Sequence, residues 1–424
     1  MMIFYSLGNL HKLPQYNKLS EEAKVALKVV GSVLPFRVNN YVTENLINWD
    51  SFQDDPIYKL TFVDKEMLSE SQFRKMKSII EDPHSNQRDI NETANSIRRE
   101  LNPHPSGQLT TNIPSFEGET VPGVQHKYRE TVLIFPSQAQ QCHSYCTFCF
   151  RWAQFVGDPE LKFSTNRERL FLDYISSHKE VSDVLITGGD PMIMQVKSLS
   201  QYILPFLEKG MEHIKNIRIG SKSLTYWPYR FTRDKDSEEV LSLFRMVKER
   251  GKHLSFMAHI NHPQEMETKE FEEAVSKILE TGAVIRTQSP LIRGINDKGE
   301  IWSDMWKKQV NLGMIPYYMF VERDTGPKHY FELPLVEALK IYQEAIRGVS
   351  GLARTARGPS MSAYPGKVCV DGIVEIQGKK VFALSLLQAR SPELVKKPFF
   401  AEYDRDAKWL TDLRPAFADR FPFE

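Results

Sequence analysis

Cys142-His143-Ser144-Tyr145-Cys146-Thr147-Phe148-Cys149 holds three of the four cysteines of this 424-residue chain. Three thiolates this close can bind three irons of a [4Fe–4S] cluster and leave the fourth iron open to a small molecule. A zinc knuckle and three unrelated cysteines are the other interpretations. A structural zinc site needs four nitrogen or sulfur ligands, and His143 is too close to Cys142 to complete one comfortably. The spacing therefore favours an iron–sulfur cluster on Cys142, Cys146 and Cys149.

Short β-rich runs alternate with amphipathic stretches on both sides of this run, from about residue 125 to 348. The predicted strands are 132–135, 183–187, 217–220, 254–259, 284–288 and 317–321. The predicted helices are 166–178, 196–209, 237–250, 268–281, 299–312 and 334–347. This alternation implies right-handed βαβ units and a parallel sheet. Six units are too few for a closed eight-fold barrel, so we predict an α/β fold with an open, partial (β/α)6 barrel and its chemistry at the carboxyl ends of the strands.

The chain divides into three predicted regions. Residues 1–120 are mostly helical and polar, and a stretch rich in Pro, Gly, Ser and Thr at 102–123 predicts a loop or linker. Residues 121–348 form the barrel. Residues 349–424 form a C-terminal α+β segment that caps it, with a hairpin expected to turn at Gln377-Gly378.

Composition narrows the class of protein. The chain is 41% hydrophobic and 26% charged with a formal net charge of +1, which gives no electrostatic reason to expect nucleic acid or a membrane as partner. Its first residues lack the basic start and the cleavage site of a signal peptide. Four cysteines are too few for a disulfide framework, and an oxygen-sensitive cluster needs a reducing compartment. We therefore expect a cytoplasmic enzyme.

The cysteine spacing, with Phe148 before the last cysteine, resembles the signature of radical S-adenosylmethionine (SAM) enzymes. A second element agrees with this resemblance. Thr187-Gly188-Gly189-Asp190-Pro191 closes a predicted strand, and paired glycines let a backbone approach a ligand closely. A turn of this kind resembles the element that holds the amino group of SAM, which assigns Gly188, Gly189 and Asp190 to the SAM site. A tight turn without function is the alternative.

Five further motifs narrow the resemblance: Pro122–Tyr128, Arg218–Ser221, His259–Pro263, Gln288–Asp297 and Pro316–Tyr318. Their order and spacing resemble those of lysine 2,3-aminomutases over about residues 120–370. The resemblance implies a 5′-deoxyadenosyl radical, pyridoxal 5′-phosphate (PLP) as second cofactor, and migration of an amino group between neighbouring carbons. It also implies an amino-acid-like substrate and a low-potential electron donor such as flavodoxin or ferredoxin. The oligomeric state stays open, a homo-oligomer included.

The same resemblance assigns roles to single residues. Lys367 takes the place of the lysine that holds PLP as a Schiff base, and Arg151 that of the arginine that binds the substrate carboxylate. A lysine in an exposed turn and an arginine in a surface ion pair are the alternatives. The remaining residues expected in the cofactor pockets are Phe148, Ser221, His259 and Gln288, with Lys127 and Tyr128 at PLP. His259 and His262 are also compatible with a metal pair or with a structural role.

One departure concerns the substrate. Lysine 2,3-aminomutases hold the distal ammonium of lysine with two aspartates; the later one corresponds to Ser360, and Asp324 lies near the earlier one. A buried ammonium needs strong compensation, and the nearby Arg354 and Arg357 suit an anionic or polar group instead. We therefore expect an aminomutase that does not use free lysine. The alternative is a radical SAM enzyme on the same scaffold that has lost or repurposed PLP and acts on another metabolite or a peptide.

Overall fold

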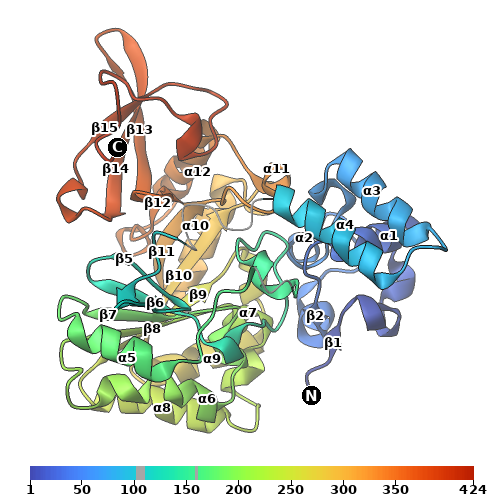
Figure 1. Ribbon diagram of the computed structural model, residues 1–424, viewed down its shortest axis with the longest axis horizontal. Helices are drawn as coiled ribbons and strands as arrows, with labels where there is room; N and C mark the ends of the chain where they lie inside the picture. The colour runs from blue at the N-terminus through green and yellow to red at the C-terminus, as the bar shows by residue number, and fades with distance from the viewer. Residues whose placement is uncertain (102–109, 158–160) are drawn as a thin grey trace. The chain divides into compact units, whose positions relative to one another are not determined.

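A computed structural model describes residues 1–101, 110–157 and 161–424 of the chain (Figure 1). The chain forms two compact units. Unit 1 comprises Met1–Pro105, Gln141–Lys162 and Asp324–Phe331, and unit 2 comprises Ser106–Gln140, Phe163–Arg323 and Glu332–Glu424. The cysteine run thus belongs to unit 1 together with the N-terminal helices, whereas Ser106–Gln140 belongs to unit 2. None of the described helices is long and apolar enough to cross a membrane.

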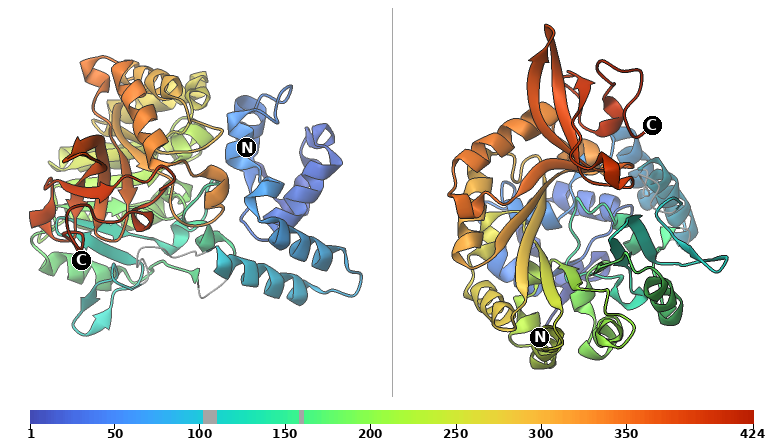
Figure 2. Two further views of the ribbon diagram at one scale, coloured as in Figure 1. Left: turned by 90° about the horizontal axis from the view of Figure 1, so that it is seen from above. Right: turned by 90° about the vertical axis from the view of Figure 1, so that its left-hand side faces the viewer.

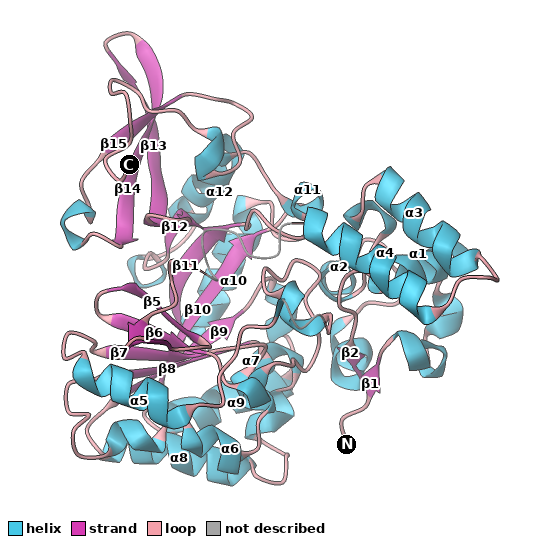
Figure 3. Ribbon diagram, in the orientation of Figure 1, coloured by secondary structure: helices cyan, strands magenta, loops and turns pink. Residues whose placement is uncertain are grey.

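Unit 2 is built on an 11-stranded sheet whose strand order follows the chain (Figure 3). Its parallel strands are β6 (Thr131–Ile134), β7 (Asp183–Ile186), β8 (Asn216–Ser221), β9 (His253–His259), β10 (Val284–Leu291), β11 (Ile315–Val321) and β12 (Arg357–Ser362). β5 (Val124–Tyr128) pairs antiparallel with β6 at one edge, and β15 (Phe399–Glu402) forms the other edge. No ladder of the described chain joins these two edges, so the predicted open, partial barrel is confirmed.

Helices lie along the outside of the curved sheet (Figure 2). They are α5 (Glu168–Ser177), α6 (Val196–Gln201), α7 (Ser223–Tyr226), α8 (Ser237–Glu249), α9 (Lys269–Glu280), α10 (Gly299–Asn311) and α12 (Leu335–Arg347). Six of them match predicted helices, but α6 is shorter than predicted. It ends before a 3₁₀ turn at Leu204–Leu207, where Pro205 cannot continue an α-helix.

Alternation along the strands separates the two faces of the sheet. Ile217, Ile219 and Ile285 are fully buried in the core under the helices. Arg218 lies between Ile217 and Ile219 on β8, and Arg286 follows Ile285 on β10. Because successive side chains of a strand point to opposite faces, both arginine side chains point to the inner face of the barrel. The inner face of unit 2 is therefore where polar chemistry is possible.

The predicted hairpin is confirmed and is longer than predicted. β13 (Gly366–Ile376) and β14 (Lys379–Ala389) pair antiparallel around Gln377 and Gly378, which both have positive φ. Two positive φ values are what a tight two-residue hairpin turn requires. β13 also pairs with β12, so the start of β13 is fixed in the middle of the sheet.

Unit 1 is mainly helical, as predicted. It contains α1 (Glu21–Gly31), α2 (Pro56–Thr61), α3 (Glu70–Glu81), α4 (Gln87–Glu100) and α11 (Lys328–Phe331), with a short ladder between β1 (Phe4–Tyr5) and β2 (Val38–Asn39). Ser69 and Asn86 cap α3 and α4 by accepting backbone hydrogen bonds. Of the predicted linker, residues 102–109 lie outside the described residues. Its later part includes a short hairpin of β3 (Ser115–Phe116) and β4 (Glu119–Thr120) in unit 2.

Candidate active site

The cysteine run is held in place by the N-terminal part of unit 1. The backbone N–H of Tyr145 donates to the carbonyl of Arg37 at 2.9 Å, and that of Thr147 donates to the carbonyl of Leu60 at 2.9 Å. The Arg37 guanidinium also lies 5.1 Å from the centre of the Tyr145 ring. Residues between the cysteines are thus anchored on both sides of Cys146, which fixes the loop without using a thiol.

The three cysteines of this loop are partly exposed. Phe148 is buried and packs edge-on against Phe331, with ring centres 6.3 Å apart. In the described parts of the chain, no three His, Cys, Asp or Glu side chains are already arranged to hold a single metal ion. A cubane cluster is larger than an ion and keeps its ligands further apart. Three accessible cysteines on one anchored loop fit a [4Fe–4S] cluster with an open iron.

The predicted glycine turn follows β7 in unit 2. The N–H groups of Gly189 and Asp190 donate to the carbonyl of Ala139 at 2.8 and 3.1 Å. A Cβ on Gly188 would lie 2.9 Å from the same carbonyl oxygen and 3.0 Å from Nε2 of Gln140. Glycine is therefore required at 188 by close packing of two backbones. The Gly189 N–H is used inside the protein, which leaves carbonyl groups of the turn for a ligand.

Asp190 has a structural task that the sequence did not predict. Its carboxylate is buried and accepts hydrogen bonds from Ser221 Oγ at 2.7 Å, Met192 N at 2.9 Å and Lys222 N at 2.9 Å. Burial raises the pKa of Asp190, and these hydrogen bonds oppose the rise. The side chains of Asp190 and Ser221 thus tie the carboxyl ends of β7 and β8 together. Positioning of the turn is thus a task that these two residues have in addition to their expected place at SAM.

Replacing Asp190 with alanine is expected to lower the free energy of unfolding by about 1–3 kcal/mol, because three buried donors lose their acceptor. SAM binding should weaken as well, since the turn loses its anchor. Urea unfolding measures the first effect and equilibrium dialysis the second. Asp173→Ala, at an exposed ion pair of unit 2, serves as the control and should change neither. Unchanged stability of Asp190→Ala would contradict this role.

His259 and Gln288 lie side by side at the carboxyl ends of β9 and β10, where they are direct partners in the parallel ladder. Burial and the neighbouring Lys222 ammonium hold the pKa of His259 well below its usual range. A neutral imidazole results. His262, in contrast, caps a 3₁₀ turn, and its Nδ1 accepts from Gln264 N at 3.3 Å. This bond favours a structural role for His262 over a metal pair.

A buried ion pair that the sequence did not indicate lies beside these residues. The ammonium of Lys222 pairs with the carboxylate of Glu265 and donates to Asn261 Oδ1 at 2.8 Å and to the His259 carbonyl at 3.3 Å. Both side chains are almost fully buried, with 9% and 0% exposure. The position of Lys222 directly after Ser221, at the end of a strand, was the available signal. This network fixes the backbone at the ends of β8 and β9.

Lys367 stands at the start of β13, and its Nζ donates to Oε1 of Gln388 on the neighbouring strand. The amine lies 5.1 Å from the centre of the Tyr128 ring and 4.8 Å from that of Tyr318. Burial, and then the positive charges of Arg218 and Arg357, lower the pKa of Lys367 to about 7. A large fraction of the amine is therefore neutral near neutral pH, and only a neutral amine can attack an aldehyde. These are the properties of a lysine that holds PLP.

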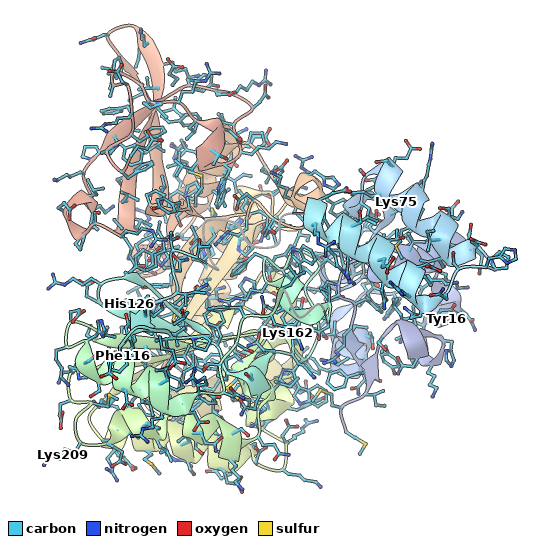
Figure 4. All side chains as sticks on the ribbon, viewed as in Figure 1. Tyr16, Lys75, Phe116, His126, Lys162 and Lys209 are labelled. Carbon is cyan, nitrogen blue, oxygen red and sulfur yellow. The ribbon has the colours of Figure 1, made fainter. Side chains whose placement is uncertain are left out.

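Lys127 and Tyr128 are brought to the same place by β5. The ammonium of Lys127 donates to the Ala363 carbonyl, in the turn between β12 and β13. Burial, followed by Arg323, Arg390 and Lys367, lowers the pKa of Lys127 to about 6. The preceding residue points away from this group: Nδ1 of His126, labelled in Figure 4, contacts the Tyr174 hydroxyl of α5. Three of the residues predicted at PLP thus lie together in unit 2.

The residues expected at the substrate belong to both units. Arg151 belongs to unit 1, where its guanidinium lies 5.2 Å from the centre of the Phe150 ring. Asp324 also belongs to unit 1. In unit 2, Ser360 is fully buried with its hydroxyl directed to the Met319 carbonyl at 3.4 Å, and Arg354 donates to the Val349 carbonyl at 3.0 Å. Of the two arginines considered for an anionic group, only Arg357 lies near Lys367.

Comparison with known proteins finds relatives along nearly the whole chain. An Aquifex aeolicus protein whose name assigns it provisionally to the L-lysine 2,3-aminomutases is 30% identical over 405 residues, which are 95% of this chain and 94% of that protein. The L-lysine 2,3-aminomutase of Haemophilus influenzae is 29% identical over 265 residues, 61% of this chain and 74% of that enzyme. No protein-family model matches. Among solved structures, a radical SAM methyltransferase from Sphaerobacter thermophilus aligns with this chain at 14% identity and a TM-score of 0.38. The alignment covers 58% of this chain and 68% of the methyltransferase chain. That similarity is too weak to support an argument.

Proposed function

Because the chain belongs to the lysine 2,3-aminomutase family of radical SAM enzymes, we propose that it moves an amino group between neighbouring carbons of an amino acid, with PLP bound to Lys367. The observation that carries the PLP assignment is the partly buried amine of Lys367 beside two tyrosine rings, with a pKa lowered to about 7. The cluster and SAM would supply the radical that starts the reaction, and PLP would hold the migrating nitrogen.

The residues of this chain have separate tasks in that proposal. Lys367 would hold PLP through its amine, and Tyr128 and Tyr318, whose rings lie beside that amine, would exclude water from the site. The cysteine run holds the cluster. Arg151 binds the α-carboxylate of the substrate, since a guanidinium pairs with a planar carboxylate through two hydrogen bonds. Free lysine is not the expected substrate, because Ser360 replaces a carboxylate and is itself buried. A low-potential donor such as flavodoxin is expected to reduce the cluster.

A product assay tests the reaction. The anaerobic protein, with cluster, SAM, PLP and a chemical reductant, is incubated with a panel of amino acids, and the products are separated by chromatography and mass spectrometry. Conversion of an α-amino acid to its β-isomer is the expected result. SAM cleavage that does not need PLP, and that gives no isomer of any amino acid, would favour the alternative. That alternative is a radical SAM enzyme that has lost PLP.

Lys367→Ala is expected to abolish the visible absorption of bound PLP, because the substitution removes the amine that would hold the aldehyde as a Schiff base. The spectrum of the purified protein after PLP addition and desalting measures this loss. Lys379→Ala, on the exposed part of β14, is the matched control and should keep the wild-type spectrum. Retention of the band in Lys367→Ala would remove the assignment.

The rate of PLP uptake should depend on pH with a midpoint near 7. The pKa of Lys367 is lowered from 10.5 to about 7, so the fraction of neutral amine rises with pH and levels off above pH 7 to 8. An exposed lysine would instead react ever faster up to about pH 10. Stopped-flow absorbance of the PLP-free protein mixed with PLP distinguishes the two profiles. A rate that still rises tenfold per pH unit at pH 9 would contradict the lowered pKa.

A further inference from the structure

The inner face of unit 2 carries more cations near Lys367 than carboxylates. Arg218 pairs with Asp183, with Nε 2.7 Å from the carboxylate oxygen. Arg286 and Arg357 approach from β10 and β12. Their guanidinium carbons lie 5.2 and 4.4 Å from the centre of the Tyr317 ring.

Arg286 and Arg357 have aromatic neighbours but no countercharge. Arg357 also lies 4.4 Å from the centre of the Tyr318 ring, and the two tyrosine rings are 4.3 Å apart. Within the described residues, neither guanidinium has a hydrogen-bond or ion-pair partner, and both side chains are partly buried. The two edge-on rings lie against both guanidinium groups while the N–H donors of the arginines stay available, an arrangement that suits a planar anion.

A second group of basic side chains lies around Tyr128. The amine of Lys127 is 5.6 Å from the centre of that ring, and burial, followed by the nearby positive charges of Arg323 and Arg390, lowers its pKa to about 6. The amine of Lys367 lies 5.1 Å from the centre of the Tyr128 ring and 4.8 Å from that of the Tyr318 ring. It is therefore close to both basic groups, and each group can neutralise one anion. PLP has a single phosphate, so one group is left for something else.

We infer that Arg286, which lies against Tyr317, and Arg357, which lies against Tyr317 and Tyr318, bind a distal carboxylate of the substrate, so that the enzyme acts on an acidic amino acid. This inference rests on the proposed function, since it takes Lys367 as the PLP lysine. The group around Tyr128 is the better match for the phosphate, because the family resemblance places Lys127 and Tyr128 there. Ser360 agrees with this assignment: it brings no carboxylate to β12 that would neutralise Arg357.

The test compares the binding of glutamate, glutamine and lysine to the PLP-loaded protein in the absence of SAM. The change in PLP absorption measures the binding of each amino acid. Glutamate and glutamine have the same shape and differ in the distal charge. We expect the wild-type protein to bind glutamate about 10- to 100-fold more tightly than glutamine, because glutamate gains one charge-assisted contact. Lysine should bind more weakly than glutamine. Equal binding of glutamate and glutamine, or tighter binding of lysine, would overturn the inference without a variant.

Variants then locate the contact. Arg357→Met and Arg286→Met, on different strands, should each weaken glutamate binding at least 10-fold and change PLP affinity less than 3-fold. Arg354→Met, whose arginine donates to Val349 and lies outside the ring pair, is the control and should change neither. Arg357→Lys should restore part of the affinity. Loss of PLP affinity in Arg357→Met would show that this group binds the phosphate instead.

Failure of the inference is distinct from failure of the proposed function. A protein that shows no Lys367-dependent PLP absorption overturns both. A protein that shows the absorption and forms a β-isomer, but has no preference for glutamate over glutamine, overturns the acidic substrate alone.

Discussion

Replacing Cys146 with alanine is expected to abolish reductive cleavage of SAM. Three thiolates are needed to hold a [4Fe–4S] cluster and leave one iron open, so loss of one ligand removes both the cluster geometry and the SAM site. The substitution should not disturb the loop, because Tyr145 and Thr147 are anchored through their backbones to Arg37 and Leu60. Anaerobic formation of 5′-deoxyadenosine with dithionite as reductant measures the effect.

The control for this experiment is Cys369→Ala. Cys369 is buried on β13 in unit 2, and burial with the nearby Asp371 raises the pKa of its thiol, so it is inert as a ligand. This variant should keep its cluster absorption and its SAM cleavage. Undiminished cleavage in Cys146→Ala would eliminate the cluster assignment, as would loss of cleavage in a folded Cys369→Ala protein.

Local periodicity was enough to predict the barrel. The apolar spacing of Phe271, Ala274, Val275 and Ile278 gave α9 within a residue or two, since these side chains form one buried face and Thr268 caps the helix. The strands were predicted for the same reason, because alternating and β-branched runs are local signals. Only α6 was predicted too long, where Pro205 ends the helical pattern.

Contacts between distant segments could not be predicted this way. Nothing near the cysteine run shows that Arg37 and Leu60 hold it, so it was placed with the barrel and not with unit 1. The sequence assigns Asp190 to the SAM site, but it does not reveal that Ser221 and Lys222 use its carboxylate. Position in family motifs, in contrast, correctly grouped Lys127, Tyr128 and Lys367.

The same limit applies to charge. Arg286 lies within a strand in which apolar and polar residues alternate. Its position in that pattern does not show whether a carboxylate faces it. Only the fold shows that Asp183 pairs with Arg218 and leaves Arg286 to the ring of Tyr317. A sequence pattern shows to which face of the sheet a side chain points. Whether its charge is paired depends on which strands are neighbours in the fold.

Lys222→Met should lower the free energy of unfolding by about 3–5 kcal/mol, since it leaves the Glu265 carboxylate buried without its charge partner. Glu265 is 0% exposed, and its other oxygen already accepts from the N–H groups of Asn261 and His262. These two donors cannot replace an ammonium. Urea unfolding of the purified protein, compared with wild type at the same pH, gives the value.

Two comparisons separate the effect of burial from that of charge. Lys308→Met removes one partner of an exposed pair with Glu267 in the same unit, and should cost less than about 1 kcal/mol. The double variant Lys222→Met, Glu265→Leu removes both buried charges and should recover much of the lost stability, because a well-packed apolar pair avoids the desolvation penalty. A single variant as stable as wild type would show that the pair does not hold β8 and β9. A double variant that regains stability but binds SAM poorly would show that the pair serves the geometry around His259 and not the stability of the barrel.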